Sequence, residues 1–144
     1  MRKFVEIFKD DNQWNEKTII GFLSFAVMVL VMLADVITDL PDWHVAVPPT
    51  TAIVTFRHEP ENLQDVITRG GTGVDVALKK RDRLQLRIAE AVKREGRFWI
   101  SAAPVPGGHA LRLNVISWLT SETLVDEFLT ELPRYAREAM AGLT

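Results

Sequence analysis

The sequence predicts an α+β fold, with a hydrophobic helix over about residues 18–38 followed by a small α/β domain. In that domain a small sheet should carry helices on one face. Three observations predict this: an uncharged run near the N-terminus, prolines that interrupt the chain after it, and alternating strand-like and helix-like hydrophobic spacing further on. We therefore expect two parts, residues 1–45 and residues 46–144.

Composition excludes several classes of protein. The chain has 144 residues, 47% hydrophobic and 25% charged, with a net charge of −2. It is too short for a large multidomain enzyme and too apolar to be disordered. The absence of cysteine excludes a disulfide scaffold, a thiolate metal site and a cysteine nucleophile. Residues 1–45 carry four Lys/Arg against seven Asp/Glu, whereas residues 46–144 carry thirteen against twelve.

The hydrophobic segment runs from Thr18 to Ala34 without a charge. As a helix it would be about 25 Å long, close to the thickness of a bilayer core, which is about 30 Å. Extending it to Thr38 reaches that length but includes Asp35. We expect residues 18–38 to span a membrane with Asp35 at the interface. A helix buried among partner chains is the main alternative, and a cleaved signal peptide fits less well.

Flanking charges predict an orientation for this helix. Lys and Arg precede it, at positions 2, 3, 9 and 17, and none occurs between residues 35 and 54. The positive-inside rule then places the N-terminus in the cytoplasm and the remaining chain across the membrane. Localisation stays open: membrane-associated if residues 18–38 insert, and cytoplasmic otherwise.

A proline-containing linker should end the first part, because proline cannot continue a helix; its prolines are Pro41, Pro48 and Pro49. Residues 50–57 are rich in β-branched side chains and are expected to form a strand. A short helix over residues 60–68 and a glycine-rich loop over residues 69–73 should follow.

A long helix is expected after this loop. Thr72 and Asp75 have the spacing of a capping pair at its start, and Gly96 is well placed to end it. Apolar residues recur near helical spacing between these limits, at positions 74, 77, 84, 88, 91 and 92. Lysines and arginines should lie mostly on the opposite, solvated face.

A hairpin is predicted next, with strands over residues 97–101 and 109–118 and a turn over residues 104–108. In the second strand Leu111, Leu113 and Val115 alternate with Arg112 and Asn114. One face should meet the core, while the other presents a guanidinium and an amide.

The chain should close with a helix capped by Thr120 or Ser121. Its apolar face is expected to contain Leu124, Val125, Phe128, Leu129 and Leu132. Pro133 should kink or interrupt this helix. The expected order of the domain is therefore strand, helix, strand, strand, helix.

The stretch LRIAEAVKREGRFWISAAPVPGGHALRLNVISWLTSETLVDEFL resembles the C-terminal small domain of pyridoxal-phosphate-dependent amino-acid decarboxylases of the aromatic-L-amino-acid, or group II, family. The matching positions are Gly96, Trp99, Gly107, Gly108, Leu111, Arg112, Val115, Ser117, Trp118 and Thr120. The resemblance covers about residues 46–141 and does not include the hydrophobic helix. It implies the C-terminal domain of a fold-type I pyridoxal-phosphate enzyme.

The same resemblance implies which parts of a working enzyme are missing. In the family, pyridoxal phosphate is held on a lysine of the large domain, beside a stacking histidine and an aspartate that pairs with the pyridine nitrogen. Those motifs have no counterpart in this sequence, and Leu119 stands where many members have an arginine. We expect no catalytic residue and no bound cofactor in this chain alone, and a large pyridoxal-phosphate domain or a homodimer partner to be required.

Arg112 is the best candidate for a functional side chain, because a guanidinium can bind a carboxylate of a substrate or of a neighbouring domain. Asn114 and Ser117 are weaker candidates for the same substrate-binding site. His58 and His109 lack metal-ligand spacing, so no metal is expected. Residues 70–73 lack the full phosphate-loop pattern. Residues 79–97 hold eight Lys/Arg but no interleaved aromatic side chain within the helix, so no nucleic acid is expected.

Three functions are compatible with the sequence. The first is a truncated or fused C-terminal domain of a decarboxylase, that is, of a carboxy-lyase that is inactive on its own. The second is a membrane-tethered α/β module that binds a partner without catalysis. The third is a truncated fusion product without a selected function.

Overall fold

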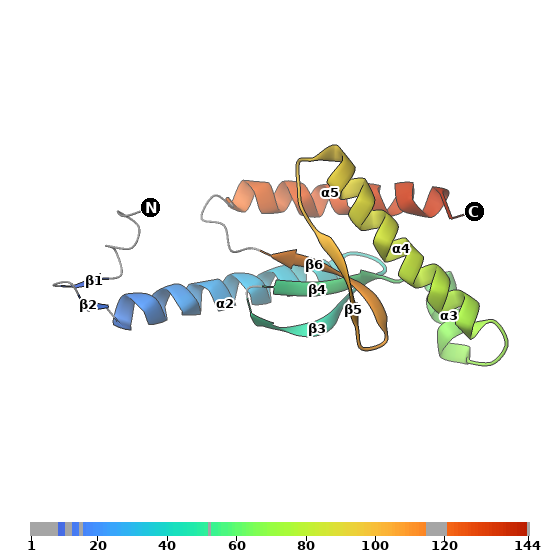
Figure 1. Ribbon diagram of the computed structural model, residues 1–144, viewed down its shortest axis with the longest axis horizontal. Coiled ribbons are helices and arrows are strands. Elements are labelled where there is room, and N and C mark those ends of the chain that lie inside the picture. The colour runs from blue at the N-terminus through green and yellow to red at the C-terminus, as the bar shows by residue number, and fades with distance from the viewer. Residues whose placement is uncertain (1–8, 11–12, 15, 52, 115–120, 144) are drawn as a thin grey trace.

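The computed structural model describes residues 9–10, 13–14, 16–51, 53–114 and 121–143. Two short paired strands come first, β1 (Lys9–Asp10) and β2 (Gln13–Trp14). Helix α2 (Glu16–Asp39) follows and extends well beyond the sheet at its N-terminal end (Figure 1). In all, the described residues form four helices and a four-stranded antiparallel sheet, which confirms an α+β fold.

Helix α2 includes the predicted segment 18–38, but its last turns belong to the core of the domain. Leu33 and Ile37 are 4% and 0% exposed and pack with residues of the sheet and of the other long helices. None of the described helices has both the length and the apolar character that a bilayer crossing requires. The expectation that residues 18–38 span a membrane is therefore not supported.

The main sheet has the strand order β3-β4-β6-β5, and every neighbouring pair is antiparallel. Its strands are β3 (Trp43–Thr51), β4 (Ile53–His58), β5 (Ser101–Val105) and β6 (Gly108–Asn114). Strands β5 and β6 form the expected hairpin, with its turn at residues 106–107, although β5 begins four residues later than predicted. The part of the predicted second strand beyond Asn114 lies outside the described residues.

Strand β3 was not predicted, because its prolines indicated a linker. Pro48 and Pro49 lie within this strand, which is an edge strand with register shifts on both sides of Val47. An edge position tolerates proline, since no strand beyond it needs the missing amide hydrogen. The opposite edge strand, β5, contains Pro104.

Three further helices follow the sequence closely: α3 (Glu61–Arg69), α4 (Val74–Glu95) and α5 (Glu122–Ala141). Gly96 ends α4 with a positive φ of 76°, and its amide donates to the Val92 carbonyl oxygen over 3.3 Å. The expected capping pair of Thr72 and Asp75 is wrong, because the capping position is Gly73, without a side-chain bond. For α5 the cap is Ser121, whose Oγ accepts from the Leu124 amide at 3.2 Å.

Of the two effects expected of Pro133, a kink or an interruption, the interruption does not occur, since α5 continues from Glu122 to Ala141. A proline removes one helical hydrogen bond. Here its neighbours Leu132 and Tyr135 are both 0% exposed. The hydrophobic burial of these two side chains stabilises the helix and offsets the hydrogen bond that Pro133 cannot donate.

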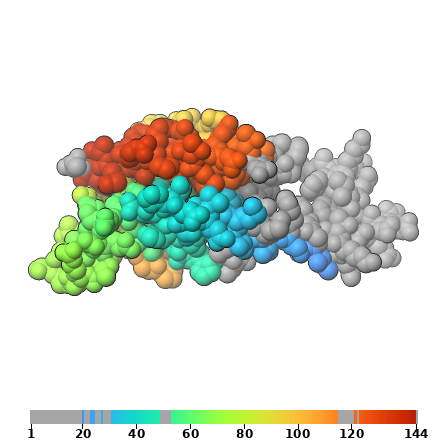
Figure 2. All heavy atoms as spheres, turned by 180° about the vertical axis from the view of Figure 1, so that it is seen from behind, coloured from blue at the N-terminus to red at the C-terminus, as the bar shows by residue number. Residues whose placement is uncertain are grey.

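A single hydrophobic core joins α2, α4 and α5 to one face of the sheet. The sheet contributes Val54 and Phe56 from β4 and Leu111 from β6, all fully buried. Seen from behind, α5 and the end of α2 lie over this side of the molecule (Figure 2). Because alternate residues of a strand point to opposite faces, the other face of the sheet carries Thr55, Arg57, Arg112 and Asn114, and we call it the outer face.

Candidate functional site

The outer face carries two of the residues that the sequence singled out. The Cα atom of Arg112 lies opposite Thr55 of β4 on one side and Ser101 of β5 on the other. Arg112 and Asn114 are both exposed, and their spacing places them on the same face. Ser117, the third candidate, lies outside the described residues.

The side chain of Arg112 makes no hydrogen bond or ion pair with another described residue, and it is exposed. A guanidinium carries five N–H donors. Such a group can bind a carboxylate with two parallel hydrogen bonds.

A cluster of charged and titratable side chains lies near Arg112 and forms hydrogen bonds with the β5–β6 hairpin. We call it the hairpin cluster; it consists of Arg57, Glu59, Arg81, Asp82 and His109. Arg57 is 9% exposed, and its Nε donates to the carbonyl oxygen of His109 at 2.9 Å. Its Nη2 donates to the carbonyl oxygens of Pro106, at 3.0 Å, and of Gly108, at 3.2 Å. These bonds connect the end of β4 to the turn.

Arg81 holds the same turn from α4. Its Nη2 donates to the carbonyl oxygen of Gly107, while Nη1 lies 3.1 Å from Glu59 Oε1. Asp82, the next residue, accepts from the backbone amide of His109 at 3.0 Å and lies 3.2 Å from its Nδ1. Burial, followed by the positive charge of Arg81, lowers the pKa of Arg57, and the carboxylates of Glu59 and Asp82 oppose this shift. The arrangement fixes the hairpin.

The sequence did not predict this cluster. His109 was considered only for metal-ligand spacing, and the arginines of α4, Arg81 among them, were expected mostly on a solvated face. The pair Gly107-Gly108 was the available signal, because two adjacent glycines suggest close approach by other groups. The arginines that approach them, however, lie 26 and 49–52 residues away in the chain.

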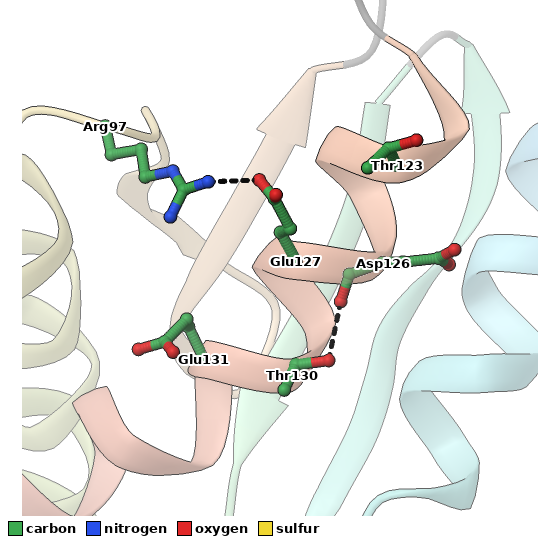
Figure 3. Close-up of a pocket in the computed structure, with 6 residues that line it drawn as sticks. All are labelled: Arg97, Thr123, Asp126, Glu127, Thr130 and Glu131. Atoms are coloured by element: carbon green, nitrogen blue, oxygen red, sulfur yellow. Dashed lines mark hydrogen bonds and ion pairs between the residues drawn. The ribbon is translucent and has the colours of Figure 1, made fainter.

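Two hollows adjoin the start of α5. The first, of about 240 Å³, lies between Arg97 and the outer side of α5 (Figure 3). Its lining residues are Arg97, Thr123, Asp126, Glu127, Thr130 and Glu131. Arg97 already forms an ion pair with Glu127. The second, of about 190 Å³, is more apolar and includes Asn114 and the 69% exposed Trp99.

The described residues do not fit pyridoxal phosphate. The lysines whose side chains are described, Lys79, Lys80 and Lys93, are exposed along α4, so none lies in a pocket where it could hold a carbonyl group. In the larger hollow three carboxylates surround one guanidinium, an environment that repels a phosphate. No group of three metal-ligating side chains occurs within the part of the chain that the structure describes.

No model of a known protein family matches the sequence, and no curated protein matches it significantly. Solved structures, in contrast, share its fold. The Oryza sativa TDC with PLP and tryptamine matches 82% of this chain at 20% identity, with a TM-score of 0.66. The Catharanthus roseus tryptophan decarboxylase in complex with L-tryptophan matches 82% at 18% identity, with a TM-score of 0.63.

A third match is the glutamate decarboxylase domain of a Vibrio parahaemolyticus diaminobutyrate-pyruvate transaminase and L-2,4-diaminobutyrate decarboxylase, at 15% identity over 82% of this chain and a TM-score of 0.62. The chain has the fold of one part of these decarboxylases. It spans only about 22% of the length of each of these three chains.

The structural match is longer than the sequence resemblance. Residues 46–141 make up about two thirds of the chain, whereas the structures match 82% of it. Since residues 40–144 account for less than three quarters of the chain, the matched part must include some of the first 39 residues.

Proposed function

We propose that the chain serves as the small domain of a pyridoxal-phosphate-dependent decarboxylase and acts by docking onto a larger, cofactor-holding domain. The observation that carries this proposal is that the structural match covers most of this chain but only a small part of each decarboxylase chain. Most of this chain matches less than a quarter of each decarboxylase chain, including one solved with PLP. The activity therefore requires residues that this chain does not contain.

The outer face of the sheet is the proposed docking surface. Its opposite face is covered by three helices, whereas Ser101, Arg112 and Asn114 remain exposed on this one. Bound pyridoxal phosphate would supply the electron sink for the loss of carbon dioxide. This chain would contribute a rigid surface and the guanidinium of Arg112, which binds a carboxylate of the substrate or of the larger domain.

The hairpin cluster supports this role by keeping β6 in place. Arg57 and Arg81 hold the turn that precedes Arg112, so that strand has little freedom to shift. A binding group on a rigid strand loses less entropy on contact than one on a loop. The cluster thus acts as a positioning element for the outer face.

A chimera tests the proposal. The matching part of the Catharanthus roseus tryptophan decarboxylase would be replaced by the corresponding residues of this chain. We expect the chimera to retain pyridoxal phosphate, measured by its absorbance, and to bind L-tryptophan. In the same chimera, Arg112→Met should weaken L-tryptophan binding by about tenfold or more without loss of the cofactor. The matched control is Arg83→Met, an exposed arginine on α4.

Two results would contradict the proposal. One is a chimera that folds, as judged by circular dichroism, but does not retain the cofactor. The other comes from the natural chain alone, incubated with pyridoxal phosphate and borohydride: the mass should stay unchanged, and a stoichiometric adduct on one lysine would show that the chain holds the cofactor by itself. The second measurement does not depend on the folding of the chimera.

A further inference from the structure

A buried histidine lies where β4 ends against the corner between α2 and β3. His58 is 6% exposed, and its ring packs against the indole of Trp43 in a tilted arrangement, with a centroid distance of 4.7 Å and an angle of 36°. Trp43 is the first residue of β3 and is itself only 1% exposed. The imidazole therefore supports the residue that anchors the corner.

The backbone of His58 is fixed from the other side by Gln85 of α4. The His58 amide donates to Gln85 Oε1 at 3.0 Å, and Gln85 Nε2 donates to the His58 carbonyl oxygen at 2.8 Å. Gln85 is fully buried and also donates to the Arg81 carbonyl oxygen. These bonds hold the main chain at position 58 in place. A change in the protonation of the imidazole would therefore mainly affect its contact with Trp43 in the corner.

The corner is attached to the same end of β4 by the first pair of the β3–β4 ladder, Trp43 opposite His58, and by one further backbone hydrogen bond. The amide of Glu59 donates to the carbonyl oxygen of Asp42 at 2.7 Å. Asp42 has a φ of +68°, a left-handed conformation that aspartate adopts more readily than most residues other than glycine. Packing between Trp43 and His58 helps to hold this turn in place.

The environment of the ring favours its neutral form. Its Nδ1 atom is buried and has no hydrogen-bond partner among the described residues. A proton added there would be a buried donor without an acceptor, on a charged ring. Burial lowers the pKa of His58; the carboxylate and backbone carbonyl of Asp42 oppose this shift, and His44 adds to it. The titratable or charged groups nearby are Asp42 in the corner, His44 in β3, Arg57 and Glu59 at the end of β4, and Arg81 in α4.

We propose that His58 is a pH-sensitive switch that controls how firmly the corner between α2 and β3 is attached to β4. The neutral ring stays beneath Trp43 and holds the corner closed. When the ring takes up a proton, it leaves this position, Trp43 loses its support, and the corner opens together with the end of α2. This inference does not depend on the proposed docking function.

The direction of the pH effect follows from proton binding. In the open corner His58 has an ordinary pKa of about 6.5, whereas in the closed corner its pKa is lower. The open form therefore binds more protons as the pH falls below about 6.5. For one proton the opening equilibrium constant rises by up to about tenfold per pH unit until the pKa of the closed form is reached.

Hydrogen–deuterium exchange of the full chain at pH 7.5 and pH 5 tests this switch. Protection, corrected for the intrinsic effect of pH on exchange, should fall at least about fivefold in peptides over residues 37–45 but stay unchanged over residues 122–141. His58→Phe keeps an aromatic ring without a titrating group, so its corner should show the same protection at both pH values. The matched control, His44→Phe, replaces an exposed histidine of β3 and removes only the smallest of the influences on the pKa of His58, so its corner should still lose protection at pH 5.

The switch is overturned if the corner of His58→Phe responds to pH as the natural chain does, or if protection falls equally in the corner and in α5. Should His58→Phe fail to fold, imidazole NMR of the natural chain decides. Proton uptake by His58 must then coincide with loss of protection at the Trp43 amide. A His58 ring that titrates while that amide stays protected would exclude the mechanism.

Discussion

Two arginines on the same face of the sheet illustrate how a single residue acquires its role. Arg57 is buried and uses its donors on three backbone carbonyl oxygens of the hairpin. Arg112, on the neighbouring strand, is exposed and makes no ion pair with any described residue. The donors of Arg57 are used within the fold, whereas the guanidinium of Arg112 has no hydrogen-bond or ion-pair partner among the described residues.

Replacing Arg57 with Leu should therefore destabilise the protein by about 1–3 kcal/mol, because three part-buried carbonyl oxygens lose their hydrogen-bond donor. Urea denaturation monitored by circular dichroism measures this loss. Arg112→Leu is the control and should change the free energy of unfolding by no more than about 0.5 kcal/mol. Equal losses in both variants would show that the carbonyl contacts of Arg57 add nothing to stability.

Tyr135 gives a second prediction at this scale, because it is the only tyrosine of the chain. Burial, followed by the hydrogen bond from its hydroxyl to Glu95, raises its pKa to about 12. Tyrosinate absorbance in a pH titration should thus show a midpoint near 12 in the native protein and near 10 in urea. Since the neutral form is favoured by folding, this contribution to stability is complete below about pH 10 and is lost as the pH rises toward about 12.

The variant Glu95→Gln tests the stated cause. It removes the acceptor charge beside the hydroxyl, so the native midpoint should move toward 10 while the midpoint in urea stays the same. A native midpoint near 10 in the natural chain would contradict the burial of this hydroxyl.

Strand alternation was sufficient to predict that Arg112 and Asn114 share a face opposite Leu111 and Leu113. It could not predict the hairpin cluster. Alternation predicts which face of the sheet a side chain occupies. The hydrogen-bond partners of a long arginine side chain depend instead on which distant residues the fold brings near it. Arg57 and the carbonyl oxygens that it binds are brought together only by the pairing of β4 with β6.

In the β5–β6 hairpin, position 108 leaves no room for a side chain. Gly108 has a φ of +120°, and a Cβ atom there would overlap the carboxylate of Asp82 and lie 2.7 Å from Arg81 Nη2. Gly96, at the end of α4, also has a positive φ, but no other atom lies within 4 Å of such a Cβ.

Gly108→Ala should consequently cost about 2–4 kcal/mol, which combines backbone strain with displacement of the Asp82 and Arg81 side chains. Gly96→Ala should cost about 1 kcal/mol, for backbone strain alone. Thermal or urea denaturation of both variants gives the comparison. Equal losses of unfolding free energy in the two variants would contradict the close approach of the Asp82 carboxylate to Gly108.

Helix α2 should contribute unevenly along its length. Ile37 is fully buried, whereas Val27 is 59% exposed on the part that extends beyond the sheet. Ile37→Ala should lower the free energy of unfolding by about 2–4 kcal/mol, and Val27→Ala by no more than about 0.5 kcal/mol. Similar losses at the two positions would mean that the whole helix is packed against something.

Local signals predicted the helices better than the strands. Gly96 and Ser121 mark helix ends by their own backbone and side-chain chemistry, and both do so in the structure. Strand β3 was missed because proline is excluded from central strands but not from edges, and only the complete sheet shows which strands are edges. The start of the next strand was also misplaced: Arg97 and Phe98 appeared strand-like, although β5 starts at Ser101.

At the scale of the whole molecule, one core connects three helices and the sheet. It includes Leu33 and Ile37, which precede the predicted boundary at residue 45, together with Leu111 and Leu132 beyond it. That boundary remains a prediction, and unfolding provides its test.

At pH 7.5 we expect urea to unfold this core in one transition. Circular dichroism and tryptophan fluorescence should give the same midpoint, because residues on both sides of position 45 share buried contacts. Ile37→Ala and Leu132→Ala should shift both signals together. Two separated transitions would instead indicate that residues 1–45 and 46–144 fold independently.

The prolines of the two outermost strands also limit how this protein can assemble. Pro48 in β3 and Pro104 in β5 have no amide hydrogen, so neither can donate a backbone hydrogen bond to an added fifth strand. Lateral growth into a continuous intermolecular sheet, the first step toward amyloid-like fibres, is thus less favourable at both edges.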